Sequence, residues 1–162
     1  MPLERNQTFM VTLNGTIVRD FGGKKLDGGN FSWSFITWAE PPAPHVIDTY
    51  PPAGAFNVNV NTYINIGFDT EMDPASLDGA FSFTDGLDVW DMTNGTVDWF
   101  SENTLFSFQP AEKLRFDSTY TVRITSNATS IYNKRLDGND NGIPDANDDF
   151  VFTGQFFPGQ KH

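Results

Sequence analysis

The residues that could do chemistry are concentrated in residues 137–148, a twelve-residue segment rich in aspartate, asparagine and glycine. Oxygen-bearing side chains stand at positions 1, 3, 5, 9 and 12 of this segment, and a glycine stands at position 6. Calcium binds six to eight oxygen ligands, and the glycine permits the sharp turn of a calcium loop. The spacing predicts a calcium (Ca²⁺) site made by the side chains of Asp137, Asn139, Asn141, Asp145 and Asp148 and the backbone carbonyl of Ile143.

The predicted calcium site should be weak. Only three of its side chains are carboxylates, which is typical of low-affinity extracellular modules. The alternative is a polar turn without a metal, because Asp, Asn and Gly favour turns by themselves. Five ligand positions in register with the glycine favour the metal site.

A second acidic set, Asp69, Glu71 and Asp73, lies on one face of an alternating segment. It could hold another cation or a catalytic carboxylate pair, but a solvated strand end with Asp73 as a helix cap is the favoured interpretation. The two histidines, His45 and His162, have no serine and aspartate that the sequence places nearby. We therefore expect that the chain is not an enzyme.

The aromatic residues suggest a third chemistry, stacking on sugars. Trp38 and Trp90 lie near turns and are expected to be exposed, whereas Trp33 and Trp99 alternate with polar neighbours and are expected in cores. Tyr120 stands where a sandwich domain has a tyrosine corner, in which the phenol bonds backbone across a turn. Phe9 at the matching place of a repeat favours a plain inward-facing aromatic instead.

That repeat links the two ends of the chain. Residues 8–13 match residues 119–124 in their apolar and polar alternation, and residues 26–28 match residues 136–138. The first copy then continues almost directly into residues 30–35, whereas the second first makes the detour that holds the predicted calcium loop. Self-similarity at a fixed offset indicates tandem modules. Residues 1–40 are therefore expected to be the C-terminal strand pair of an incomplete domain.

Composition limits the classes of partner. The chain has 162 residues, no cysteine and a net charge of −11, so disulfides and thiolate metal sites are excluded. Nucleic acid and anionic membrane surfaces would be repelled by this charge. No apolar run is long enough to span a bilayer, and residues 1–5 lead into no apolar signal core, so we expect no secretion signal in this sequence.

Short alternating segments separated by turn residues follow the proline-rich residues 41–44. Strands are expected within residues 62–69, 81–83, 95–100, 104–108, 119–124 and 149–156. Period-two alternation with frequent turn signals predicts an all-β chain that forms an antiparallel sandwich. The one helical signal, residues 73–77, predicts a single turn that Asp73 caps and Pro74 begins.

Several motifs in this order resemble the bacterial and archaeal Ig-like domain found in tandem in S-layer and other cell-surface proteins. They are residues 51–55, 58–62, 64–73, 108–110, Leu114 and 119–122. The resemblance covers residues 44–157, and residues 7–37 resemble the last two strands of the same family. It implies a sandwich of about seven strands that acts as a spacer or adhesive stalk without catalytic residues. The inserted loop resembles EF-hand-like and thrombospondin-type calcium loops, although strands rather than helices flank it.

The expected organisation is an incomplete domain at 1–40, a linker at 41–44, a complete Ig-like sandwich at 45–157 and a tail at 158–162. The expected function is a structural or adhesive module of an extracellular or cell-surface protein, with neighbouring repeats or other copies as partners. Two alternatives stay open: a fibre subunit that assembles by strand addition through residues 7–37, and a module that binds surface glycans. Sequons that fit an exported protein begin at Asn6, Asn14, Asn30, Asn94 and Asn127.

Overall fold

The computed structural model describes residues 3–26, 29–39 and 41–157. The predicted tail at 158–162 lies outside the described residues. The chain divides into two compact units, Met1–Pro41 and Pro42–His162, and each is described by itself. Among the described residues, no helix is long and apolar enough to cross a lipid bilayer.

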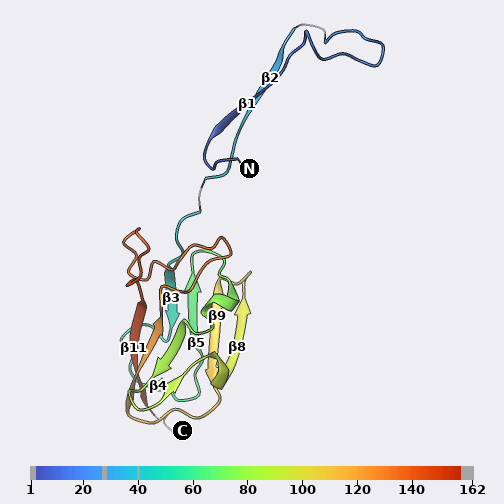
Figure 1. Cartoon of the computed structure of the whole chain (residues 1–162). Coiled ribbons are helices and arrows are strands. Elements are labelled where there is room, and N and C mark those ends of the chain that lie inside the picture. The colour runs from blue at the N-terminus through green and yellow to red at the C-terminus, as the bar shows by residue number, and fades with distance from the viewer. Residues whose placement is uncertain (1–2, 27–28, 40, 158–162) are drawn as a thin grey trace. The chain divides into compact units, whose positions relative to one another are not determined.

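The second unit is the predicted β-sandwich (Figure 1). Seven of its strands have four or more residues: β3 (Val46–Tyr50), β5 (Ile64–Phe68), β6 (Phe81–Thr84), β8 (Gly95–Phe100), β9 (Leu105–Pro110), β10 (Ser118–Ile124) and β11 (Phe150–Phe157). Two further strands have only two residues each: β4 (Val58–Asn59) and β7 (Val89–Trp90). The all-β, Ig-like fold class is thus confirmed.

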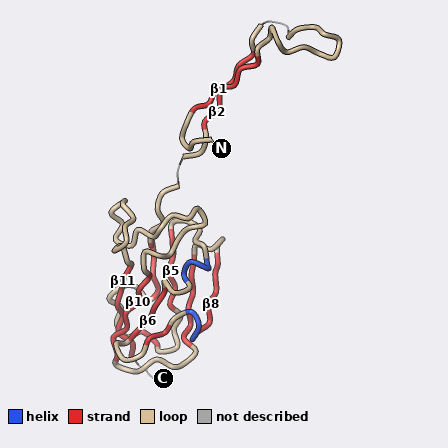
Figure 2. Tube along the Cα trace, viewed as in Figure 1, coloured by secondary structure: helices blue, strands red, loops and turns tan. Residues whose placement is uncertain are grey.

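The strands form two layers. One sheet has the order β4-β11-β10-β6-β7, and the other has the order β3-β5-β9-β8. All pairings are antiparallel except that between β4 and β11, which is parallel. Figure 2 shows that the helical turns of the described residues are short and lie between strands. They are the 3-10 turns η1 (Pro74–Leu77) and η2 (Met92–Asn94).

Aromatic side chains from both layers fill the core. Phe81 lies on one sheet, and its ring centroid is 4.9 Å from those of Phe106 and Phe108 on the other sheet. All three rings are buried, as are Ile64 and Ile66. Each such side chain contributes about 1.5–3 kcal/mol when it is removed from water. The alternation of apolar and polar residues along the strands creates this core, since successive side chains point to opposite faces.

The first unit contains one antiparallel hairpin, the N-terminal hairpin, made of β1 (Thr8–Leu13) and β2 (Phe31–Ile36). Its register follows that of β10 and β11. Val11 stands opposite Trp33 in the hairpin, and Val122 stands opposite Phe152 in the sandwich. Matching these two pairs aligns all six pairs of the hairpin ladder with six of the seven pairs of the β10–β11 ladder, including Leu13 with Ile124.

The loops that join the paired strands also repeat their hydrogen bonds. The N–H of Leu26 donates to the carbonyl of Val18 at 3.2 Å, and the N–H of Leu136 donates to the carbonyl of Ala128 at 2.8 Å. Isolated bridges link Arg19 to Lys25 in the first loop and Thr129 to Arg135 in the second. The sequence repeat is therefore a repeat of three-dimensional structure.

Candidate functional site

The candidate calcium loop, residues 137–148, leaves and re-enters the sandwich through a narrow neck. The N–H of Gly138 donates to the carbonyl of Asp148 at 3.1 Å. A Cβ atom at Gly138 would lie 2.3 Å from that carbonyl oxygen, so glycine is required at this close approach. The N–H of Asp137 donates to the carbonyl of Pro44 at 2.8 Å. The loop is therefore attached to the segment that enters the first strand of the sandwich.

Within the loop, the predicted ligands organise the backbone. The Asp137 carboxylate accepts hydrogen bonds from the N–H groups of Asn141 at 3.1 Å and Gly142 at 2.7 Å. Asn139 Oδ1 accepts from the N–H of Asn141 at 3.0 Å, and Asn141 Oδ1 accepts from the N–H of Ile143 at 2.8 Å. Each of these acceptors stands two to five residues before its donor, so the chain wraps around its own side-chain oxygens.

The far end of the loop closes on the same region. The Asn139 amide donates to the Asp148 carboxylate, and the N–H of Asp145 donates to the other Asp148 oxygen at 2.6 Å. Asp137 and Asp148 are only 3% and 2% exposed. Asp145 is exposed and accepts from the N–H of Asn147 at 2.7 Å. Of the predicted ligands, those at the two ends of the loop are buried, and Asp145 remains at the surface.

The donor set suits calcium better than a transition metal. Among the described residues, no group of three or more His, Cys, Asp or Glu side chains is arranged to hold a metal ion. Calcium does not require such a group, because amide and backbone carbonyl oxygens complete its coordination. Two buried carboxylates and two asparagine amides in one loop fit that chemistry, with Asp145 close along the chain to supply the third carboxylate.

Two residues of the second acidic set, Asp69 and Asp73, have separate structural roles. Asp73 caps η1, since its Oδ1 accepts from the N–H of Ala75 at 3.1 Å. Asp69 instead bonds His45: its carboxylate accepts from the backbone N–H at 2.8 Å and lies 3.2 Å from Nδ1. The solvated strand end and cap are thus the observed arrangement. No pattern in the sequence indicated the His45–Asp69 contact, which depends on the pairing of β3 with β5.

Tyr120 combines the two roles that the sequence presented as alternatives. Its ring is buried, and its hydroxyl accepts from the N–H of Arg115 at 2.7 Å across the turn before β10. Burial raises the pKa of this phenol. Arg115 in turn bonds Asp85 and Asp88. Burial would raise the pKa of Asp85, but hydrogen bonds from the Asp88 and Leu87 N–H groups and from Arg115 lower it overall.

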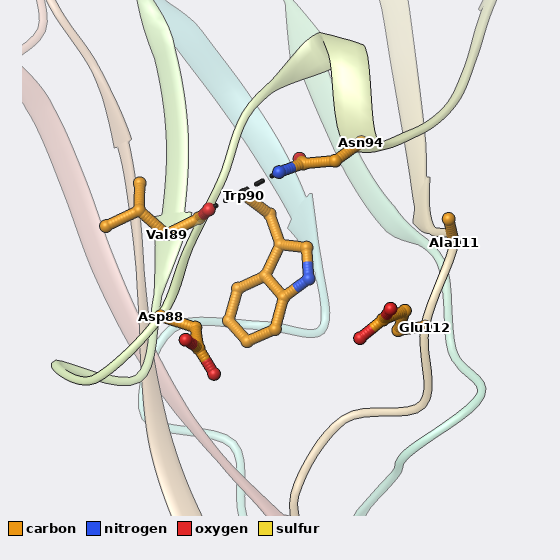
Figure 3. Close-up of a pocket in the computed structure, with 6 residues that line it drawn as sticks. All are labelled: Asp88, Val89, Trp90, Asn94, Ala111 and Glu112. Carbon is orange, nitrogen blue, oxygen red and sulfur yellow. Dashed lines mark hydrogen bonds between the residues drawn. The ribbon is translucent and has the colours of Figure 1, made fainter.

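A shallow pocket of about 320 Å³ tests the sugar-stacking hypothesis (Figure 3). Its lining comprises Asp88, Val89, Trp90, Asn94, Ala111 and Glu112. Trp90 was expected to be exposed, but it is only 8% exposed because its ring packs against Phe83 and Tyr120 at centroid distances of 5.6 and 5.8 Å. A ring covered in this way offers little surface to a sugar, so the pocket does not support glycan stacking. Trp38 is exposed as expected.

One face of the N-terminal hairpin consists only of apolar residues. It is formed by Phe9, Val11, Leu13, Phe31, Trp33 and Phe35. We name this set the hairpin face. Trp33, expected in a core, is 44% exposed, and Phe31 is 58% exposed. The prediction for Trp33 is wrong because the strand pair in this unit has no second layer over it among the described residues.

The chain belongs to the bacterial Ig-like domain family, whose model matches residues 40–154. No curated protein sequence matches the chain significantly. Among solved structures, CopC from Methylosinus trichosporium OB3b is similar in fold, with a TM-score of 0.51 and 10% identity over 74% of this chain and 98% of that one. At this identity, the likeness shows the fold alone.

Two other solved structures align less closely. An L,D-transpeptidase from Mycobacterium smegmatis gives a TM-score of 0.47 and 15% identity, over 70% of this chain and 40% of that chain. The S-layer protein SbsC gives a TM-score of 0.47 and 14% identity, over 73% of this chain and 14% of that chain. The chain therefore spans less than half of either protein.

Proposed function

We propose that this chain is a non-enzymatic structural module of a bacterial surface or extracellular protein, and that residues 137–148 bind calcium. Membership of the Ig-like family and a sandwich filled by packed aromatics support the structural role. The observation that carries the calcium proposal is the loop itself. Its side-chain oxygens at positions 1, 3 and 5 hold the backbone in a wrap, and two buried carboxylates mark its ends.

Calcium at this loop would stiffen the entrance to the sandwich. Asp137 bonds the carbonyl of Pro44, and His45 lies 4.0 Å from Asp140 and 3.2 Å from Asp69. A cation that holds Asp137 in place would also hold the residues that follow the proline-rich segment. Such a link between loop and linker suits a module whose task is to transmit position along an array.

The test is the melting temperature of the chain with and without calcium. A dissociation constant of about 0.1–1 mM, as in extracellular modules, gives about 1.4–2.7 kcal/mol of stabilisation at about 10 mM calcium. This corresponds to a rise of roughly 4–10 °C for a domain of this size. Magnesium at the same concentration should have little effect, because it requires a tighter octahedral site.

Two matched variants distinguish a calcium ligand from a neighbouring aspartate that is not a predicted ligand. Asp145→Ala removes an exposed predicted ligand and should abolish most of the rise, whereas Asp140→Ala makes the same change at a highly exposed neighbour and should preserve it. Because neither side chain is buried, both variants should fold. An equal calcium response in all three proteins, or none in the wild type, would contradict the proposal.

A further inference from the structure

Within its own unit, the described residues place no second layer over the hairpin face. The equivalent residues of β10 and β11 include Tyr120, Val122, Ile124 and Phe152, and all four are buried beneath the other sheet of the sandwich. In the hairpin, Leu13, Phe31, Trp33 and Phe35 are 40–58% exposed. The same backbone register therefore presents a buried face in one unit and an open face in the other.

The opposite face of the hairpin is different in character. It carries the residues Thr8, Met10, Thr12, Ser32, Ser34 and Ile36. Thr12 and Ser32 bond each other through their hydroxyl groups at 2.8 Å across the strands. One side of the hairpin is thus mainly polar, and the other is wholly apolar. A lone two-stranded hairpin of this kind is marginal in water, so covering its apolar face is strongly favourable.

The remaining question is which surface can cover it. Inner faces of the sandwich are already paired with each other, and their residues form one buried cluster. The outward sides of β5, β6 and β10 carry polar residues or glycine, namely Asn65, Gly67, Ser82, Thr84, Thr121 and Arg123. The sheets also expose the apolar side chains of Ile47, Phe100 and Val151, but these stand on β3, β8 and β11, which are not neighbouring strands. Among the described surfaces of a second copy, the face that matches in having contiguous apolar residues on paired strands is the hairpin face itself.

Charge favours the same occupant. Residues 1–41 carry four basic and four acidic residues, whereas residues 42–162 carry the whole net charge of −11. Two sandwiches would repel each other, but two hairpins approach without net repulsion. We propose that the hairpin face is a homotypic docking surface on which a second copy of this chain packs face to face. The two hairpins then form a small four-stranded sandwich with a shared aromatic core.

The size of the surface sets the expected affinity. Three half-exposed aromatic side chains and Leu13 offer on the order of 300–400 Å² per copy, given about 150–250 Å² for a whole aromatic residue. The total is below the roughly 1,200 Å² of a standard stable interface. The dimer should therefore be weak, with a dissociation constant in the range of about 10 µM to about 1 mM.

Sedimentation equilibrium of the full chain over about 1 µM to about 2 mM tests this proposal. The average mass should rise from 18.1 kDa towards twice that value. Trp33→Glu should weaken association at least about tenfold, because a charge would be buried in the shared core. Ser34→Glu is the matched control on the polar face and should leave association within about twofold. Trp33→Phe keeps an aromatic ring at this position and should preserve association. That result would show that a substitution at residue 33 does not by itself unfold the hairpin.

A monomeric wild-type chain at the highest concentration would overturn the proposal. So would an equal loss in Trp33→Glu and Ser34→Glu, since it would place the contact at the strand edges, as in strand addition. Association should persist in Asp145→Ala and without calcium. The outcome is therefore independent of the calcium proposal.

Discussion

The N-terminal hairpin and the β10–β11 pair have the same local structure and different surroundings. Both place Val opposite an aromatic residue at the centre of the ladder, as Val11 with Trp33 and Val122 with Phe152. In both strand pairs, one side chain also accepts a hydrogen bond from the backbone at the start of the connecting loop. Asn30 Oδ1 accepts from the N–H of Gly15 at 3.1 Å, and Asp149 Oδ1 accepts from the N–H of Ser126 at 3.0 Å.

The difference lies in what covers the apolar side. Ala128 and Leu136 in the sandwich are completely buried, whereas the matching Val18 and Leu26 of the first unit are more than one third exposed. Backbone hydrogen bonds also join the second loop to the segment after β5, as from the N–H of Asp73 to the carbonyl of Thr129 at 2.9 Å. Strand pairing is therefore encoded locally, while burial is supplied by other elements.

The largest expected effect comes from truncating one of two aromatic residues, Phe152 and Trp33, that occupy equivalent positions in the two ladders. Phe152→Ala should lower the free energy of unfolding of the sandwich by about 3–5 kcal/mol, because it leaves a cavity under a second sheet. Trp33→Ala should change the sandwich transition by less than about 0.5 kcal/mol, since its ring is half exposed in the other unit. Urea unfolding at low protein concentration measures both.

The outward-facing Thr153→Ala provides the control for the Phe152 variant and should stay within about 0.5 kcal/mol of the wild type. If Trp33→Ala destabilised the sandwich as much as Phe152→Ala, the two units would share one core and the comparison would fail.

The sequence predicted the strands well because alternation is a local property. It located β8 at residues 95–100 and the capped turn at Asp73, since both depend on neighbouring residues. It missed β3, β4 and β7. The partner of β4 is β11, near the other end of the chain, and β3 pairs with β5 across an intervening segment that contains β4. The strand β7 pairs with the nearby β6, but its two residues are too few to show alternation. The exposure of Trp33 and the burial of Trp90 were also mispredicted, because each depends on which element lies over the ring.

The candidate calcium loop also combines local features that the sequence predicted with a long-range contact that it did not. Its residue spacing predicted a wrap around side-chain oxygens, and the hydrogen bonds of Asp137, Asn139 and Asn141 follow that spacing. The attachment of Asp137 to Pro44 could not be predicted, since it joins residues that are distant in sequence. Calcium binding itself stays a prediction.

A smaller test concerns a polar contact that the two ladders do not share. Tyr120 bonds the N–H of Arg115, whereas Phe9 at the matching position has no hydroxyl. Tyr120→Phe should lower the free energy of unfolding of the sandwich by about 1 kcal/mol, because the Arg115 N–H loses its acceptor. Phe9→Tyr should give no matching gain. Thermal unfolding of both variants checks this, and a cost below about 0.3 kcal/mol for Tyr120→Phe would mean that water replaces the phenol.

The smallest expected effect comes from the charge that distinguishes Asp149 from Asn30. Burial would raise the pKa of Asp149, but hydrogen bonds from Arg123 and from the Ser126 N–H lower it overall. A carboxyl whose pKa is lower in the folded state stabilises the protein above its unfolded value of 3.8, and that contribution is lost as the pH falls through the folded value. The matching Asn30 makes the same backbone hydrogen bond without a charge.

Asp149→Asn therefore gives the sandwich the residue type that the N-terminal hairpin has at the matching position, Asn30. The difference in stability between this variant and the wild type then measures the effect of the charge. Because Arg123 is half exposed, we expect a loss of only about 0.5–1 kcal/mol at pH 7, and less at high salt. The variant and the wild type should converge in stability as the pH falls through the folded pKa of Asp149, which lies below 3.8. Asp85 and Asp91, whose pKa values are also lowered, remain in both proteins and give them a common acid sensitivity. A stability difference that stayed constant as the pH fell through the folded pKa of Asp149 would show that Asp149 acts through its shape and hydrogen bond, as Asn30 does, rather than through its charge.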